Sequence, residues 1–120
     1  MKQVILDTSF ILMAIRTKID FLETLKFKGF QVIVPIQVLN ELEKIIESKK
    51  KLKFRDEAEL ALKLLKKTKT IDIGNDYVDK GLIDYSEQNK EIIVATMDKE
   101  LKSELHCQKL VIRGKRLEIL

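Results

Sequence analysis

Two aspartates stand directly after hydrophobic, strand-like runs at opposite ends of the chain. Asp7 follows residues 4–6, and Asp98 follows residues 92–97. In a parallel α/β sheet, residues just past the carboxyl ends of the strands gather at one edge, where ligands bind. Carboxylates brought together there repel one another unless a cation binds or one of them is protonated. The pair therefore predicts a site for a hard divalent cation.

Glu41 and Asp79 are expected at the same edge. Glu41 lies three residues after Val38 and four before Ile45, so in a helix it borders the buried face and needs a partner. Each aspartate taken alone is equally well explained as a helix cap, because Asp is a favoured N-cap residue. Asp79 also suits the third position of a capping box led by Asp76. The convergence of all four acids favours a metal site.

Small hydroxyl residues accompany these acids. Thr8 and Ser9 follow the first strand-like run, and Thr96 lies near the end of the later one. Such side chains can hydrogen-bond and orient metal-binding carboxylates. Hydroxyl residues are also common at strand-to-helix turns for local backbone reasons. Both interpretations stay open at this point.

Length and composition indicate a single domain spanning residues 1–120. With 45% hydrophobic residues, the chain can fill one core. No apolar stretch approaches the ~20 residues of a membrane span, so we expect a soluble cytoplasmic protein. The single cysteine, Cys107, excludes an internal disulfide, and with the single histidine, His106, it excludes a four-ligand zinc set.

Lysine and arginine outnumber the acidic residues, 23 against 19, for a net charge of +4. Charge runs by themselves are most simply solvated surface. Beside an acidic metal pocket, however, cations are what a phosphodiester substrate requires, because they bind its backbone while metal ions act on the scissile phosphate. We place one basic run near the substrate because it connects helices expected to start at the acidic edge. This basic run comprises Lys49, Lys50, Lys51, Lys53 and Arg55.

Apolar runs typical of strands alternate with amphipathic segments typical of helices. The helical segment 10–28 is expected to break near Thr17–Asp20 and to end at Gly29. Asp56, with Glu59 three residues on, predicts a helix start by a capping box. The other expected helices are residues 36–48, 78–89 and 98–105, and the expected strands are 3–6, 31–35, 70–73, 91–96 and 109–113, the last turning back at Gly114 into a hairpin. Strands separated by helices imply a parallel sheet covered on both faces.

These ordered acids resemble the PIN domain, a family of metal-dependent RNA-cleaving enzymes. The segments that carry the resemblance are ILDTSFIL at 5–12, VLNELEK at 38–44, VDKGLI at 78–83 and IVATMDKELK at 93–102. The last is similar to the branch concerned with small-subunit ribosomal RNA processing in archaea and eukaryotes. The resemblance implies an α/β three-layer sandwich, PIN-like (5′-nuclease-like), around a mainly parallel sheet of about five strands.

The resemblance also implies a site and a reaction. Magnesium or manganese would be bound by Asp7, Glu41, Asp79 and Asp98, and a metal-activated water would cleave a single-stranded RNA phosphodiester. The implied partner is RNA, in the first place a ribosomal precursor, and the oligomeric state stays open between a monomer and a homodimer.

The third motif departs from the family pattern, in which members of this branch commonly carry two adjacent acids. Here Asp79 is followed by Lys80, and the next acid is Asp84. If the helix begins at Asp76, Asp84 lies about 7.5 Å further along its axis than Asp79, at about 1.5 Å per residue. That displacement favours Asp79 as the third ligand.

Other function classes fit less well or remain open. A haloacid-dehalogenase-like phosphatase needs a second acid where Ser9 stands, and a receiver domain needs paired acids where Thr8 stands. A VapC-type toxin ribonuclease, paired with an antitoxin, shares the expected fold and metal site. A catalytically silent RNA-binding scaffold in ribosome assembly is a further alternative.

Overall fold

The computed structural model describes all 120 residues as an α/β fold around one six-stranded sheet. The strand order is β3-β2-β1-β4-β5-β6, parallel throughout except for the antiparallel pair β5 and β6. The strands are β1 (Gln3–Leu6), β2 (Gln31–Pro35), β3 (Lys69–Ile71), β4 (Ile93–Ala95), β5 (Gln108–Arg113) and β6 (Arg116–Ile119). The helices are α1 (Thr8–Arg16), α2 (Phe21–Phe27), α3 (Ile36–Glu47), α4 (Leu52–Leu64), α5 (Val78–Gln88) and α6 (Lys99–Glu104).

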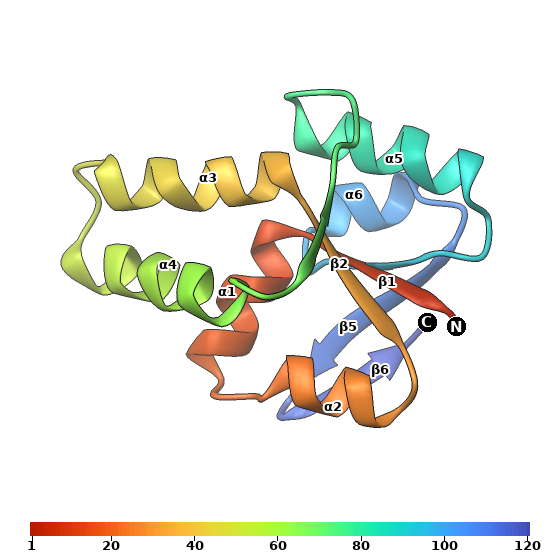
Figure 1. Ribbon diagram of the computed structural model, residues 1–120, viewed down its shortest axis with the longest axis horizontal. Coiled ribbons are helices and arrows are strands. Elements are labelled where there is room, and N and C mark those ends of the chain that lie inside the picture. Colours follow the sequence, from red (N-terminus) through yellow and green to blue (C-terminus); the bar gives the residue numbers. More distant parts are fainter.

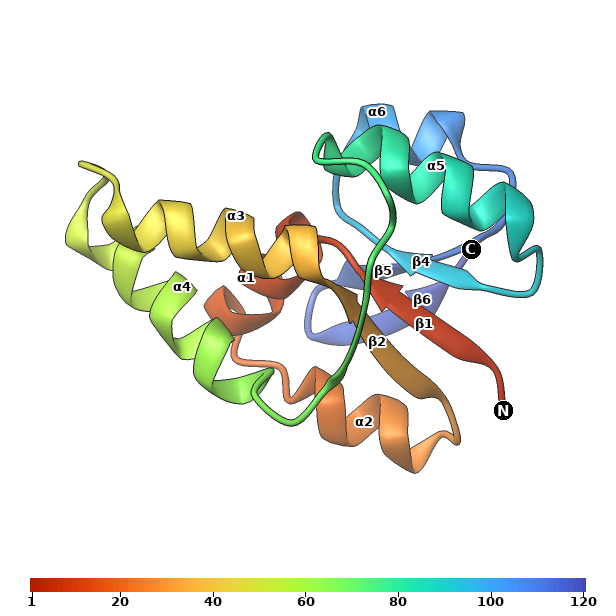
Figure 2. The same cartoon turned by 45° about the horizontal axis from the view of Figure 1, so that its top comes forward.

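Helices cover both faces of this sheet. Figures 1 and 2 show α5 and α6 together on one side and α1 to α4 on the other. The connections that leave the neighbouring strands β1 and β4 therefore go to opposite faces. In open α/β sheets this switch in direction leaves a crevice at the carboxyl ends of the two strands, where ligands bind.

The central strands explain why this arrangement is stable. Val4, Ile5 and Leu6 are consecutive in β1 and all fully buried, so both faces of the strand lie in the core. Phe10 of α1 and Phe21 of α2 pack edge to face, with ring centroids 5.9 Å apart. This contact fixes the first crossover on the sheet.

Most expected elements are confirmed, including the break in the first helical segment. Lys18 has a positive φ of 58°, and the Asp20 side chain accepts a hydrogen bond from the Glu23 amide at 3.3 Å, which starts α2. The turn at Gly114, with φ of 61°, adds the hairpin strand β6. The sheet thus has six strands, one more than the expected about five.

The expected start of α4 at Asp56 is wrong. The helix begins at Leu52, with Lys51 at its N-cap, so Asp56 and Glu59 lie inside it. Lysine is a good helix former, and α4 packs along α3 as an antiparallel hairpin, which favours a longer helix than the local capping pattern indicates. No helix in the fold has both the length and the apolar character required to cross a bilayer.

Candidate active site

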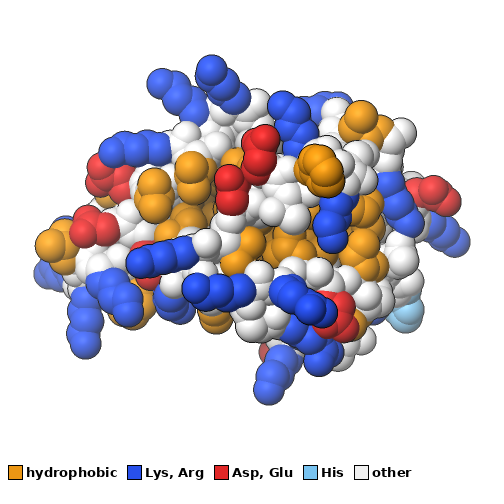
Figure 3. Space-filling view, turned by 90° about the horizontal axis from the view of Figure 1, so that it is seen from below, with side chains coloured by type: hydrophobic (Ala, Val, Ile, Leu, Met, Phe, Trp, Pro, Cys, Tyr) orange, Lys and Arg blue, Asp and Glu red, His pale blue; other side chains and the backbone are white.

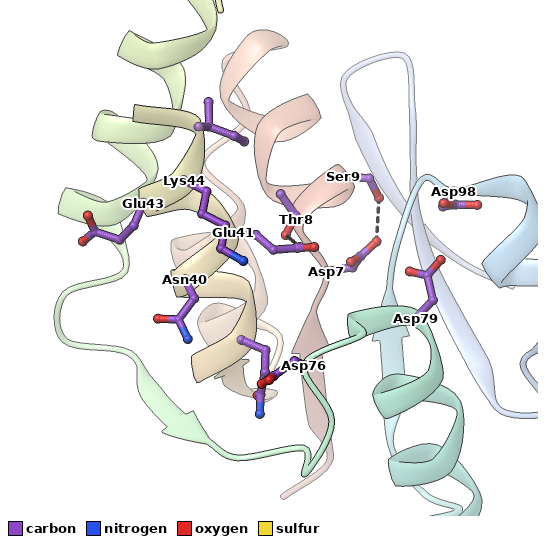
Figure 4. Close-up of a pocket in the computed structure, with 12 residues that line it drawn as sticks. Asp7, Thr8, Ser9, Asn40, Glu41, Glu43, Lys44, Asp76, Asp79 and Asp98 are labelled. Carbon is purple, nitrogen blue, oxygen red and sulfur yellow. Dashed lines mark hydrogen bonds between the residues drawn. The ribbon is translucent and has the colours of Figure 1, made fainter. Parts of the chain in front are cut away.

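An open cleft of about 850 Å³ lies at the carboxyl edge of the sheet, between α3 and the start of α5 (Figure 4). This volume is within the usual range for ligand pockets. Its lining is polar, with Ile45 as its one hydrophobic residue. The lining residues are Asp7, Thr8, Ser9, Gln37, Asn40, Glu41, Glu43, Lys44, Ile45, Asp76, Asp79 and Asp98.

The four acids predicted from the sequence all line this cleft. They come from the end of β1, the second turn of α3, the first turn of α5 and the residue before α6. Figure 4 shows the carboxyl groups of Asp7, Asp79 and Asp98 pointing toward one another, with Glu41 further along on α3. Asp84 is exposed and does not line the cleft.

Asp7 is the buried centre of a hydroxyl network. Its Oδ2 accepts hydrogen bonds from Ser9 Oγ at 2.8 Å and from Thr96 Oγ1 at 2.7 Å. The Ser9 hydroxyl accepts in turn from the Met97 amide at 3.0 Å, and the Thr96 hydroxyl from the Asp98 amide at 3.1 Å. The network therefore ties the turn after β1 to the turn after β4.

Two of the other acids also have local partners. Thr8 Oγ1 donates to Glu41 Oε1 at 2.5 Å, which gives this half-buried carboxylate the partner that its helical position requires. Asp98 Oδ1 accepts from the Leu101 amide at 3.0 Å. All three hydroxyl residues noted in the sequence thus bond to a carboxylate of the cleft.

The capping interpretation holds for one aspartate. Asp98 is the N-cap of α6 and its side chain makes the capping bond. Asp7 occupies the N-cap position of α1 without a side-chain cap. The capping box led by Asp76 is wrong, because Tyr77 is the N-cap of α5 and no side chain caps that helix. Asp79 therefore has no structural role as a cap.

Burial and mutual repulsion raise the pKa values of two cleft acids, Asp7 and Asp79. Loss of solvent raises the pKa of Asp7, although hydrogen bonds from Thr96, Ser9 and the Thr8 backbone oppose this effect. Burial likewise raises the pKa of Asp79, and the surrounding negative charges raise it further. Those charges belong to Asp7, Asp98, Glu41 and Glu100. The cleft is thus an environment in which a bound cation would relieve repulsion.

The donor set fits a hydrated hard cation. All four candidate donors are carboxylates, the ligands that Mg²⁺ and Mn²⁺ prefer. As the side chains stand, no three acidic, histidine or cysteine groups are close enough to hold one ion together. Mg²⁺ usually binds through one or two carboxylates and keeps several waters, so water bridges or side-chain rotation would complete the coordination.

Several cleft residues were not singled out from the sequence. Gln37 and Lys44 lie four residues before and three residues after Glu41, so their helical spacing was the signal that could have found them. Lys44 is the one cation that lines the cleft, and it takes part in no ion pair. Asn40, Glu43, Ile45 and Asp76 complete this group.

The basic run does not line the cleft. It was placed there because it connects two helices expected to start at the acidic edge, and only one of them, α3, does so. The α3 helix starts at the acidic edge and lines the cleft as far as Ile45, and the basic run begins just beyond its last residue, Glu47. The second helix, α4, starts at that far end and not at the cleft. Figure 1 shows the α3–α4 connection at the far end of the hairpin. Figure 3 shows basic side chains spread over one face of the molecule without a single patch. RNA would have to follow α3 to contact both the basic run and the cleft.

Comparison with known proteins assigns the family. A family model described as a PIN like domain matches residues 4–115. The chain belongs to the PIN-like domain family. This confirms the resemblance carried by the four sequence segments and the α/β fold it implied.

Individual relatives agree with this assignment. The chain is 31% identical to Ribonuclease VapC4 of Methanocaldococcus jannaschii, over 97% of this chain and 94% of that protein. The PIN domain endonuclease Utp24 has a similar structure, with a TM-score of 0.79 and 24% identity, covering 98% of this chain and 90% of that chain. VapBC2 from Rickettsia felis, bound to a DNA fragment, gives a TM-score of 0.56 and 21% identity, covering 89% and 98%. The two structural likenesses show a shared fold.

The raised pKa of Asp7 predicts how its removal changes stability with pH. Because folding raises this pKa above 3.8, the folded protein binds the proton more tightly than the unfolded chain, and stability is lost as pH rises through the folded pKa. We expect metal-free Asp7→Asn to gain melting temperature relative to the parent as pH rises from about 4 toward neutral. Thermal melting in a chelator measures this difference, with the exposed Asp84→Asn as control. A melting-temperature difference between variant and parent that stays constant or moves against the variant as pH rises would contradict a destabilising charge at Asp7.

Manganese binding at the cleft predicts a second melting result. A ligand that binds only the folded state raises the melting temperature by mass action. We expect Mn²⁺ to stabilise the parent and Asp84→Asn equally, and to stabilise Asp7→Asn and Asp98→Asn less. Equal shifts in all four proteins would place any bound metal elsewhere.

Proposed function

We propose that this protein is a metal-dependent endoribonuclease that cleaves single-stranded RNA in the cytoplasm, with ribosomal RNA precursors as its substrate. One observation carries the proposal: four carboxylates from separate elements converge in a polar cleft at the switch point of a PIN-family sheet. Raised pKa values at two of these acids, Asp7 and Asp79, are typical of functional sites.

The proposed metal is Mg²⁺ or Mn²⁺, held by Asp7, Glu41, Asp79 and Asp98. When bound, such an ion supplies an acidified water and neutralises charge that develops on the phosphate. The protein contributes orientation. Hydroxyl bonds hold the Asp7 and Glu41 carboxylates, and the helix cap holds Asp98.

Lys44 is suited to the substrate side of the reaction. Its ammonium group lines the cleft three residues from Glu41 and has no carboxylate partner. A phosphate oxygen of the RNA backbone is the counter-charge that this position accepts. Lys44 would then help to hold the scissile phosphodiester against the repulsion of the surrounding acids.

A toxin ribonuclease is the second candidate. The 31% identity to Ribonuclease VapC4 over nearly the whole chain favours it, whereas the TM-score is higher for Utp24 than for VapBC2. The toxin role predicts an antitoxin gene beside this one, while the processing role predicts ribosomal RNA in an in vivo crosslinking map. A catalytically silent RNA-binding scaffold would bind divalent metal and cleave none of these RNAs. A homodimer is compatible with each role and is tested by sedimentation.

Cleavage kinetics test the proposed ligands. We expect Asp7→Asn, Asp79→Asn and Asp98→Asn to lose orders of magnitude in the single-turnover rate with Mn²⁺, because each removes a charge that binds the ion. Asp84→Asn should cleave at close to the parental rate, because Asp84 is exposed outside the cleft. The reverse ranking of Asp79 and Asp84 would show that the third acid is misassigned.

The basic run can be tested by the salt dependence of RNA binding. Replacing Lys49, Lys50, Lys51 and Lys53 with Gln should weaken binding and flatten the logarithmic salt slope by about 0.7 for each phosphate that the variant no longer neutralises. The binding assay uses Asp7→Asn as background, so that RNA is not cleaved. A charge-matched control replaces exposed lysines that precede or start β2 and β3, at the opposite edge of the sheet: Lys28, Lys66, Lys67 and Lys69. If both sets change the slope equally, the basic run is ordinary solvated surface.

A further inference from the structure

The two helices that carry Glu41 and Asp79 belong to different packing groups. The α3 helix packs against α4, α1 and β2, whereas α5 packs against α6 and β4. There is no substantial packing between α3 and α5. Figure 2 shows only the segment that leaves β3 passing between them. Direct helix packing therefore does not set the separation of these two acids.

One buried side chain of α3 holds that segment. Gln37 Nε2 donates to Asp72 Oδ1 at 2.7 Å, and Gln37 Oε1 accepts from the Ile73 amide at 3.3 Å. Asp72 Oδ1 also accepts from the Gly74 amide at 2.8 Å. Gln37 is 7% exposed and lies one helical turn before Glu41 on the same face. These contacts, which we call the Gln37 bridge, fasten the segment to the helix of Glu41.

The same segment packs against α5 where Ile73 lies close to Gly81. A Cβ at Gly81 would lie 2.6 Å from Ile73 Cδ1 and 2.9 Å from Ile73 Cγ1, so no larger residue fits there without movement. Gly81 is two residues after Asp79. Glycine is unfavourable inside a helix, and this close approach gives a reason for it. Ile73 is thus bonded through its amide to α3 and packed through its side chain against α5.

We propose that Gln37 is a positioning residue that sets the separation between Glu41 and Asp79 across the cleft. Although Gln37 lines the cleft, its amide group is engaged by Asp72 and the Ile73 amide, so it acts through Ile73 and Gly81. The effect of Gln37 on the separation of the two helices follows from these contacts alone. Its effect on catalysis rests on the proposed function.

The chemistry of the bridge suggests a variant pair. An amide is needed at position 37, because the side chain donates to a carboxylate and accepts from a backbone amide. Gln37→Glu keeps the size and the acceptor but sets two carboxylates against each other. Adding Asp72→Asn supplies an amide donor to the new glutamate, so the double variant should regain part of the parental contact between α3 and the segment after β3. Asp72→Asn alone keeps an acceptor for both Gln37 and Gly74.

The separation itself can be measured without metal or RNA. Spin labels on Glu47→Cys and Asp84→Cys, in a Cys107→Ser background, report the distance between exposed positions of α3 and α5 by double electron–electron resonance. We expect Gln37→Glu and Gly81→Ala each to broaden or shift the distance distribution. Gln37→Glu with Asp72→Asn should move it back toward the parent. Unchanged distributions in both single variants would overturn the proposal.

Kinetics supply the functional readout, at temperatures well below each melting transition. We expect Gln37→Glu to lower kcat on the order of 10²-fold and to raise the Mn²⁺ concentration for half-maximal rate, with a smaller effect on KM for RNA. Asp72→Asn should restore part of the loss. A parental kcat and Mn²⁺ response in Gln37→Glu would refute the catalytic consequence. A parent that cleaves no RNA would refute the proposed function instead, while the label distances would still test the bridge.

Discussion

Repulsion among four carboxylates at the carboxyl edge of the sheet is the constraint that the surrounding structure must satisfy. Each acid would be solvated separately in the unfolded chain, so bringing them together raises the free energy of the metal-free fold. Hydrophobic burial in the sheet offsets this cost. The consecutive residues Val4, Ile5 and Leu6 are fully buried in β1, and β4 beside it is equally buried. Hydrophobic burial on both faces fixes the register that places Asp7 close to the turn leading to Asp98.

Hydroxyl groups make this arrangement specific without adding charge. Ser9 and Thr96 share one oxygen of Asp7, and each also accepts a backbone amide from the turn after β4. A hydroxyl suits this position because it can donate to a carboxylate while it accepts from an amide. The side chains that orient the buried acid therefore also join the two strand ends.

The similarity to Utp24 and VapBC2 concerns the scaffold, which proteins with different targets share. One feature of this chain beyond the scaffold lies in the cleft itself, because Lys44 lines it as its one cation. Lys80, which follows Asp79 in the sequence, is exposed and does not line the cleft. Lys44 lowers the net negative charge of the cleft, which makes the approach of a phosphodiester less unfavourable.

The sequence by itself determined the parts of the molecule that follow from local pattern. Alternating apolar and amphipathic runs predicted the parallel strands and most helices, because burial on two faces or on one helical stripe leaves a clear periodicity. The positions of Asp7 and Asp98 after strand-like runs predicted their convergence, since parallel strands share one carboxyl edge. The place of Glu41 beside a buried helical face likewise predicted that it would need a partner, which is Thr8.

Tertiary structure decided what depends on contacts between distant segments. Only the fold shows that Asp98 is a helix cap whereas Asp79 is not, because both occur in equally plausible capping patterns. Packing against α3 moved the start of α4 away from the capping box at Asp56. The length and direction of α3 carried Lys49 away from the cleft, and a contact across 35 residues joined Gln37 to Asp72. Such pairings leave no periodic signal, because they arise from the spatial order of the strands and not from the spacing of residues along the chain.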